Sequence, residues 1–156
     1  MNADKKHVYF RANVGIVVIN HARRVLACER ADHKGAWQLP QGGMHQGEEP
    51  LDAACRELEE ETGIPSGKVE LVGEYPEWLA YELPPASRSS KKGRGQVQKW
   101  FWFRFHGSAK DIRLGPEFQS WKWMSLKRLA VITASFRRPI YAKLLAYSTA
   151  RASRER

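Results

Sequence analysis

Apolar and polar positions divide the first 47 residues into short extended segments. The β-branched run at 14–19 predicts a buried strand, and the apolar stretch at 25–28 predicts its hairpin partner across a turn at 20–24. The segment 35–43 combines turn and extended signals. Glycine and polar residues at 42–47 predict a loop.

A helix is predicted at 50–62. Pro50 suits the first helical position, and Gly63 followed by Pro65 suits the end of the helix. Apolar side chains recur at helical spacing between these limits and should face the core as a stripe. The stripe consists of Leu51, Ala54, Cys55, Leu58 and Thr62.

Strand and helix patterns alternate along the rest of the chain, which is typical of an α/β fold. In the last helix, Ile140, Leu144, Leu145 and Tyr147 should point inward. The predicted strands are 69–75 (with an extension toward residue 81), 97–105 and 120–124, and the predicted helices are 125–131 and 139–150.

The length and composition fit one α/β domain spanning 1–156. A chain of 156 residues with 42% hydrophobic and 11% aromatic residues can build one core, and this composition excludes disorder over most of its length. Two exceptions are expected: a mobile loop at about 84–96, where composition is simple, and a disordered tail at 151–156.

The sequence shows neither a membrane-spanning segment nor a signal peptide. No apolar run approaches the roughly 18–20 residues that span a bilayer, and residues 1–6 are polar, without the apolar centre of a signal peptide. We therefore expect a cytoplasmic protein with no membrane partner. In that reducing compartment, Cys28 and Cys55 are interpreted as buried thiols, with a disulfide as the alternative.

Charge is distributed unevenly. The formal net charge is +9, but the segment 48–61 holds seven acidic residues and one arginine, so it carries −6 and the remainder +15. A concentrated acidic site on a basic body suggests bound cations together with a polyanionic partner. The alternative is a solvated acidic helix on a basic protein, and composition does not separate the two.

Three carboxylates lie on one face of the predicted helix. Glu57, Glu60 and Glu61 stand at i, i+3 and i+4 in its last turns, where the helix dipole disfavours negative charge. We expect them to be exposed and to bind a divalent cation. Oxygen ligands without nearby His or Cys favour Mg2+ or Mn2+, although surface glutamate runs are also common. Arg56 should fork onto Glu48 and fix the preceding loop to the helix.

The surrounding spacing matches the Nudix box, which is Gly, five residues, Glu, seven residues, then Arg-Glu-aliphatic-x-Glu-Glu-x-Gly-aliphatic. The chain thus resembles the Nudix hydrolases. Blocks at 11–17, 37–43, 98–101, 116–118 and 135–141 are similar to the bacterial RNA 5′-pyrophosphohydrolase branch, which overlaps with dinucleoside polyphosphate hydrolases. The box positions are Gly42, Glu48, Arg56, Glu57, Leu58, Glu60, Glu61, Gly63 and Ile64.

The resemblance implies an α/β/α sandwich with a mixed sheet, and an enzyme that hydrolyses phosphoric anhydride bonds. Glu57, Glu60 and Glu61 would hold Mg2+, or Mn2+ as a substitute, with Glu117 and the Gly42 carbonyl as further ligands. A metal-bound water would attack phosphorus. Glu57 is the expected general base, with Glu117 as the alternative; Arg56 and Glu48 complete the catalytic set.

The resemblance also suggests a substrate pocket. Its phosphate contacts would be Arg11, Arg30, Lys99 and Arg137, while Tyr81 and Phe136, with the Arg30 guanidinium plane, would stack the first base. Other interpretations stay open: Phe136 suits a core position, and Arg30 suits a solvated surface. The chain departs from the branch at Glu29-Arg30-Ala31, where two arginines and an aromatic residue are usual, and the segment 84–96 matches poorly.

Three functions follow from this pattern. The leading hypothesis is an RNA pyrophosphohydrolase that converts 5′-triphosphate ends to monophosphates and so promotes mRNA decay. The second is a hydrolase of dinucleoside polyphosphates or nucleoside triphosphates, and the third is a non-catalytic nucleotide- or RNA-binding module. The oligomeric state is either monomer or homodimer. Lys91, Lys92 and Arg94 would contact an RNA backbone or simply be solvated.

Overall fold

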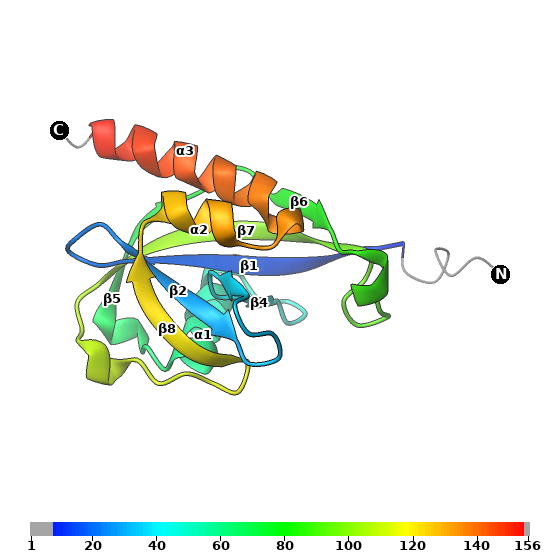
Figure 1. Ribbon diagram of the computed structural model, residues 1–156, viewed down its shortest axis with the longest axis horizontal. Helices are drawn as coiled ribbons and strands as arrows, with labels where there is room; N and C mark the ends of the chain where they lie inside the picture. The colour runs from blue at the N-terminus through cyan, green and yellow to red at the C-terminus, as the bar shows by residue number, and fades with distance from the viewer. Residues whose placement is uncertain (1–7, 155–156) are drawn as a thin grey trace.

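Eight strands form one mixed sheet in the computed structural model, which describes residues 8–154 (Figure 1). The central path runs β3-β2-β1-β7-β5, while β4 also pairs with β1, β6 with β7 and β8 with β2. Only β1 and β7 pair in parallel among the described strands. The strands are β1 Phe10–Ile19, β2 Val25–Arg30, β3 Trp37–Gln38, β4 Gln41–Gly43, β5 Val69–Glu74, β6 Leu79–Glu82, β7 Gly95–Phe105 and β8 Phe118–Met124.

Helices cover both faces of this sheet, as Figure 1 shows. The helix α1 (Pro50–Thr62) packs on one face, and α2 (Leu126–Ile132) and α3 (Arg138–Arg154) pack on the other. Short 3-10 turns lie at Ser66–Lys68, Pro85–Ser87, Ala109–Asp111 and Ser135–Arg137. The predicted α/β/α sandwich is confirmed. No helix within residues 8–154 is long and apolar enough to cross a bilayer.

The limits of α1 agree with the prediction because its end signals are local. Pro50 occupies the first turn, where its missing N–H costs nothing. Gly63 ends the helix in the left-handed conformation, with φ 75°, and donates its N–H to the Glu59 carbonyl at 2.9 Å. A Cβ at Gly63 would also collide with the Arg113 backbone, which packs directly against this end of the helix.

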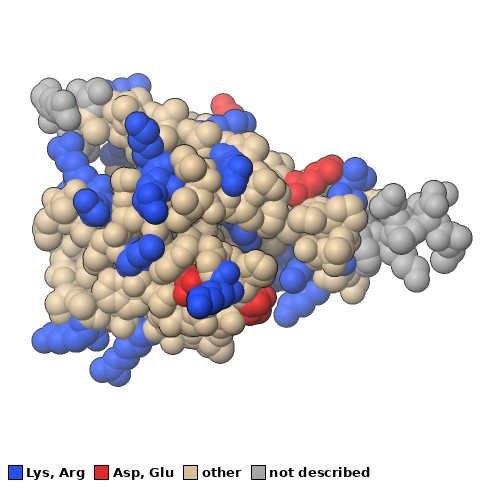
Figure 2. Space-filling view, viewed as in Figure 1, with Lys and Arg blue, Asp and Glu red and all other residues tan. Residues whose placement is uncertain are grey.

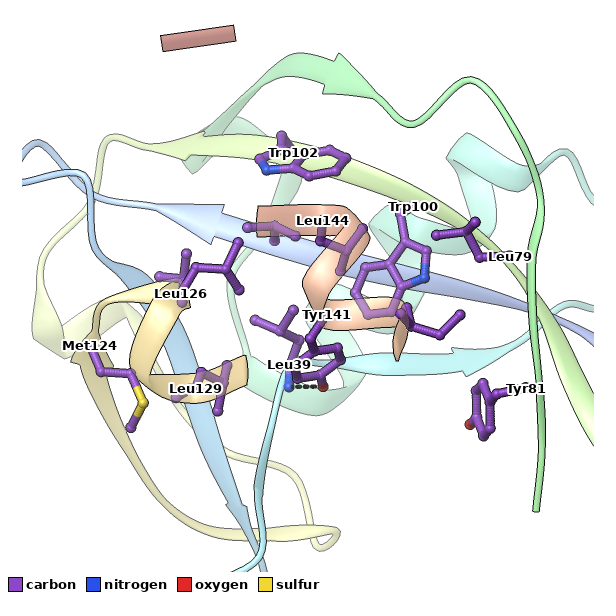
Figure 3. Close-up of a cluster of buried hydrophobic side chains, with 14 of the residues drawn as sticks. Leu39, Leu79, Tyr81, Trp100, Trp102, Met124, Leu126, Leu129, Tyr141 and Leu144 are labelled. Carbon is purple, nitrogen blue, oxygen red and sulfur yellow. Dashed lines mark hydrogen bonds between the residues drawn. The ribbon is translucent and has the colours of Figure 1, made fainter. Parts of the chain in front are cut away.

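Two apolar cores lie on the two faces of the sheet. The α1 face packs Val14, Ile16 and Phe101 against Leu58. The opposite core, drawn in Figure 3, packs Trp100, Tyr141 and other large side chains between β1, β7 and the two C-terminal helices. Full burial of each such side chain stabilises the fold by about 1.5–3 kcal/mol. Here Leu39 donates its backbone N–H to the Tyr141 hydroxyl at 2.8 Å, which fixes the chain just before β4.

The predicted loop at 42–47 is partly wrong, because residues 41–43 form β4. This strand pairs with β1 in an antiparallel register that includes Asn13 opposite Gly43. Pairing of this kind uses only backbone groups, so glycine does not prevent it. The extension of the fifth strand toward residue 81 is also wrong: β5 ends at Glu74, and Pro76, which lacks an N–H, lies in the break before β6.

Four further expectations differ from the structure. Leu51 is exposed rather than inward, since α1 buries Ala53 and Ala54 at its N-terminal end instead. Both thiols are free, but Cys55 is only half-buried. Residues 151–154 are helical rather than disordered, because α3 continues to Arg154; residues 155–156 lie outside the described residues. In the segment 84–96, strand β7 already begins at Gly95.

Candidate active site

Arg56 joins the loop before α1 to the helix itself. Its Nε and Nη2 donate to the two carboxylate oxygens of Glu48, each at 2.9 Å, as the sequence predicted. Nη2 also donates to the Gly43 carbonyl at 2.9 Å, and Nη1 donates to Glu57 at 2.9 Å and to Glu60 at 3.2 Å. The hydrogen bonds that Arg56 donates to Glu48 lower the pKa of Glu48 to about 2. One guanidinium therefore fixes the positions of three carboxylates and the end of β4.

Glu57 lies directly beneath the backbone of β4. A Cβ on Gly42 would overlap the Glu57 carboxyl group, so only glycine allows this approach. The side chain is largely buried rather than exposed as expected. Burial raises the pKa of Glu57, and the hydrogen bond from Arg56 opposes this effect. The backbone of β4 and the carboxylate are thus brought into direct contact.

Glu61 is the most buried carboxylate of the helix, with only 5% of its surface exposed, which corrects the expectation that it is open to solvent. It accepts the Gln41 backbone N–H at 3.1 Å. Burial, together with the negative charges of Glu117 and Glu57, raises the pKa of Glu61 to about 10. Glu57 and Glu61, at positions i and i+4 of the helix, therefore face β4, whereas the Glu60 side chain at i+3 is 57% exposed.

The segment before β8 carries Glu117 to this cluster. Arg113 donates its N–H to the Thr62 carbonyl at 2.7 Å, and Gly115 donates to the Glu61 carbonyl at 2.9 Å. These bonds satisfy carbonyls that the end of α1 leaves without a partner. Ala31 then donates to the Glu117 carbonyl at 2.9 Å. Glu117 is thereby held beside Glu61, close enough to perturb its pKa.

The chemistry of this donor set suits a hard divalent cation. Glu57, Glu61 and Glu117 offer only oxygen atoms, and a bound cation would relieve the repulsion that the exposed Glu117 exerts on the more buried Glu57 and Glu61. In this structure Arg56 supplies the positive charge beside Glu57 and Glu60. Among residues 8–154, no three carboxylate, imidazole or thiol groups already converge in a way that could hold a metal ion.

A network of buried amide side chains lies on the other side of β4, and sequence reasoning missed it. Gln98 donates to Asn13 at 2.8 Å and to Gln41 at 3.2 Å. Gln41 donates to the Tyr81 hydroxyl and to Gln96, each at 3.2 Å, and Tyr81 donates to Gln96 at 2.9 Å. Glutamines within otherwise apolar strand segments were the sequence signal that could have indicated this network. A polar side chain that is buried in such a strand needs a specific hydrogen-bond partner.

Two predicted phosphate ligands occupy different surroundings. The Arg11 guanidinium lies against Gly43, where a Cβ would overlap it, and so adjoins the strand that contacts Glu57. Arg30 is held by Asp32 through two bonds of 2.8 and 2.9 Å, and it also donates to Gln38 at 3.3 Å. Arg11 therefore lies on the face of β4 opposite Glu57, because successive strand positions face opposite sides. Arg30 is oriented by Asp32, whose hydrogen bonds raise the pKa of the guanidinium, and it lies close enough to Glu117 and Glu61 for their negative charges to raise this pKa further.

Tyr81, Phe136 and Arg137 stack on one another. The Tyr81 and Phe136 rings are 5.6 Å apart, and the Arg137 guanidinium lies 4.4 Å from the Phe136 centroid. Tyr81 is buried, so its ring is not open for stacking as predicted. Phe136 is partly buried against the core. Arg137 is only 8% exposed, yet its Nε has no hydrogen-bond partner within the described residues.

Lys99 differs most from the prediction. Its ammonium donates to the carbonyls of Tyr75 at 2.8 Å and Pro76 at 3.2 Å, and it pairs with Glu74 at 3.1 Å. These contacts fasten the β5–β6 connection to β7. They occupy the ammonium with neighbours from the connection, and none of its hydrogen bonds or ion pairs joins it to the carboxylate cluster.

Comparisons with known proteins identify the family to which this chain is similar. The family model of the NUDIX domain matches residues 9–144. An RNA pyrophosphohydrolase of Bartonella henselae is 44% identical over 154 residues, covering 87% of this chain and 88% of the relative. One of Rhodospirillum rubrum is 43% identical over 143 residues, covering 88% and 86%.

Solved structures give the same fold. The structure of a C. elegans Ap4A hydrolase in a binary complex has a TM-score of 0.69 with 23% identity, and the alignment covers 90% of this chain and 98% of that one. The carboxylates predicted from the box lie around β4 and α1, with Glu117 beside them. The family match spans most of the chain, and the relatives align over nearly their full lengths. This protein therefore belongs to the Nudix family of hydrolases.

Proposed function

We propose that this protein is an RNA pyrophosphohydrolase, which removes pyrophosphate from the 5′-triphosphate end of RNA to leave a 5′-monophosphate and so promotes mRNA decay. The observation that carries this proposal is identity of 43–44% over most of the chain to bacterial proteins bearing that name. The intact box supports a catalytic role over the non-catalytic binding module, because every carboxylate of the motif is present.

Mg2+ is the proposed cofactor, with Mn2+ as a possible substitute. Nudix hydrolases generally use divalent metal ions. Glu57, Glu60, Glu61 and Glu117 would hold the ions with the Gly42 carbonyl. Bound there, a divalent cation lowers the pKa of water and neutralises phosphate charge. Glu57 would accept the proton of the attacking water, with Glu117 as the alternative base, and its contact with Gly42 supports this role by fixing its position.

Basic side chains would bind the triphosphate. Arg11 is supported by its position against Gly43, and Arg137 by its buried guanidinium with an unpartnered Nε, since such a group gains most from an anion. Arg30 and Phe136 remain proposed contacts of the first base. Lysine and arginine side chains are spread over the face shown in Figure 2, where acidic side chains are few, which favours a polyanionic substrate. A phosphate contact by Lys99 would require its ammonium to exchange the carbonyls of Tyr75 and Pro76 for the substrate.

Arg56 and Glu48 would act by holding this arrangement in place. Their paired hydrogen bonds keep the Gly43 carbonyl, Glu57 and Glu60 in fixed relation before substrate binds. Such preorganisation is valuable because a displacement of about 1 Å can lower a rate about 100-fold. We also infer a cytoplasmic location, consistent with two free thiols, and either a monomer or a homodimer.

Hydrolysis of dinucleoside polyphosphates or nucleoside triphosphates is the second candidate, since the same carboxylates would serve it. The two functions differ in specificity, which the ratio of kcat/KM values measures. Purified protein with Mg2+ should turn over a 5′-triphosphorylated oligonucleotide at a higher kcat/KM than a dinucleoside tetraphosphate, with 5′-monophosphate RNA as product. A higher kcat/KM for the tetraphosphate would instead establish the second function.

A pair of variants on α1 controls for indirect effects. Glu61→Gln should lower turnover of triphosphorylated RNA about 100-fold or more, because it removes a buried carboxyl ligand from the proposed cation site. Glu59→Gln changes an exposed carboxylate of the same helix and should leave turnover unchanged. Equal activity of the two variants would refute the role of Glu61.

A further inference from the structure

Two aromatic rings with exposed faces lie at the start of β1, beside Arg11. Tyr9 and Phe10 are 42% and 41% exposed. Glycine backbone supports both rings from one side: a Cβ on Gly93 would crowd the Tyr9 ring, and one on Gly95 would collide with the Phe10 ring. Rings that are supported on one side and open to solvent on the other are suited to stacking with flat ligand groups.

The loop before β7 is fastened to these rings. Arg94 donates its backbone N–H to the Tyr9 carbonyl at 2.9 Å, and Gly93 forms β-bridges with both Phe10 and Ser89. Gly93 has a φ of 74°, which a residue with a side chain rarely adopts. Figure 1 shows this loop and the start of β1 side by side at one end of the molecule. Sequence-distant groups thus share one surface.

Two lysines at the tip of the loop have uncompensated charge. Glu82 pairs with Arg94 at 3.0 Å and with Arg88 at 3.6 Å, so these arginines are partly neutralised. Lys91 and Lys92 are exposed, and within the described residues neither ammonium takes part in a hydrogen bond or an ion pair. Both lysines therefore lie on the loop whose Gly93 and Arg94 pack against the segment that carries the two rings.

This surface adjoins the proposed triphosphate site. Phe10 and Arg11 are consecutive, and an extended chain places Tyr9 about 7 Å from Arg11. Arg11 in turn lies against Gly43, whose carbonyl is bound by Arg56. A chain held at its 5′ end by Arg11 could continue over the rings and lysines. Single-stranded nucleic acid is recognised by this combination of stacking rings and backbone-binding cations.

We propose that Tyr9, Phe10, Lys91 and Lys92, here named the downstream surface, bind RNA nucleotides that follow the 5′-triphosphate end. The proposal rests on the proposed function for its substrate and adds a second point of contact with it. It would distinguish a transcript from a free nucleotide, because only a longer chain supplies nucleotides and backbone phosphates beyond the 5′ end for this surface to bind.

Substrate length tests the downstream surface. Wild-type protein should hydrolyse a 5′-triphosphorylated 12-mer at a higher kcat/KM than a triphosphorylated dinucleotide with the same first two bases. The double variant Lys91→Ala/Lys92→Ala should lower kcat/KM for the 12-mer about fivefold or more and leave that for the dinucleotide unchanged. The double variant should also depend less on salt. The slope of log kcat/KM against log salt concentration should become shallower by about 1.4, because each of the two lost phosphate contacts contributes about 0.7 to the slope.

Control variants separate this surface from general charge effects. Lys110→Ala/Lys127→Ala removes two exposed lysines from η4 (Ala109–Asp111) and α2. This variant should leave kcat/KM unchanged for both the 12-mer and the dinucleotide. Tyr9→Ala should also reduce turnover of the 12-mer only. The proposal is overturned if the wild-type protein shows no preference for length, if both lysine pairs have equal effects, or if the Lys91/Lys92 variant loses dinucleotide turnover equally.

Failure of the proposed function would be visible separately, as absence of hydrolysis of the triphosphorylated dinucleotide. In that case, fluorescence anisotropy with a labelled 5′-hydroxyl uridine 12-mer still measures the downstream surface. Binding that weakens at least fivefold in Lys91→Ala/Lys92→Ala, and not in the control pair, supports it. Equal RNA binding by wild type, Lys91→Ala/Lys92→Ala and the control pair contradicts the proposed downstream surface. The same equal binding is expected if this surface binds a protein segment and not RNA.

Discussion

Replacing Tyr141 with Phe removes one hydroxyl from the core on the α2–α3 face and keeps the ring. That hydroxyl accepts the Leu39 N–H at 2.8 Å, across 102 positions of sequence. Both residues are fully buried, so water cannot replace the lost acceptor. A buried N–H without a partner costs about 1–3 kcal/mol. For a domain of this size, Tm should fall by about 2–4 °C for each kcal/mol.

A second tyrosine on the same helix is the matched control. Tyr147 donates its hydroxyl to the Glu74 carbonyl at 2.8 Å in an exposed position. Tyr147→Phe should change the free energy of unfolding by no more than about 0.5 kcal/mol, since water can solvate the carbonyl. Urea denaturation of the three proteins measures the difference. If Tyr141→Phe costs no more than Tyr147→Phe, the bond to Leu39 does not stabilise the approach to β4.

Alkaline pH gives an independent check of the same group. Burial raises the pKa of Tyr141 from about 10 to about 12, with Arg137 opposing the shift. The unfolded phenol therefore ionises first, so the stability due to Tyr141 is complete below pH 10 and is lost as pH rises toward 12. The stability difference between wild type and Tyr141→Phe should narrow over that window. A constant difference would contradict the burial argument.

Two further substitutions test the site. Gly42→Ala should lower kcat for triphosphorylated RNA about 100-fold, because its Cβ displaces the Glu57 carboxylate, whereas Gly67→Ala, whose Cβ meets nothing within 4 Å, should be neutral. Arg56→Lys retains the charge but loses the fork that binds Glu48, so kcat should fall at least tenfold with a lower Tm. Unchanged kcat in either Gly42→Ala or Arg56→Lys would disprove the positioning role assigned there.

Local signals account for what the sequence predicted correctly. The limits of α1 depend on Pro50 and Gly63 themselves, and the Glu48–Arg56 contact joins two residues of one motif. Such features need no knowledge of distant segments. The strand pattern was likewise readable wherever β-branched or aromatic residues lie in runs, as in β1 and β7.

Long-range packing accounts for most of the differences. The depth of Glu61 depends on β4, which hydrogen-bonds to it through Gln41. The contacts of Lys99 depend on the turn at Tyr75 and Pro76, and no periodic pattern indicates that a lysine will bind carbonyls there. The amide network needs β1, β4, β6 and β7 to meet at one place, so single residues gave only a weak signal.

We propose that buried carboxylates around β4 support metal-dependent hydrolysis of RNA 5′ ends. The most direct test of this proposal is pyrophosphate release from 5′-triphosphorylated RNA over a range of Mg2+ concentrations. The proteins compared are wild type, Glu57→Gln and Glu49→Gln, the last being an exposed residue that makes no side-chain cap at the start of α1. We predict Mg2+-dependent turnover by wild type and Glu49→Gln. In Glu57→Gln, turnover should be reduced about 100-fold or more. Equal turnover by Glu57→Gln, or full wild-type turnover in the presence of a chelator, would contradict metal-dependent catalysis by these carboxylates.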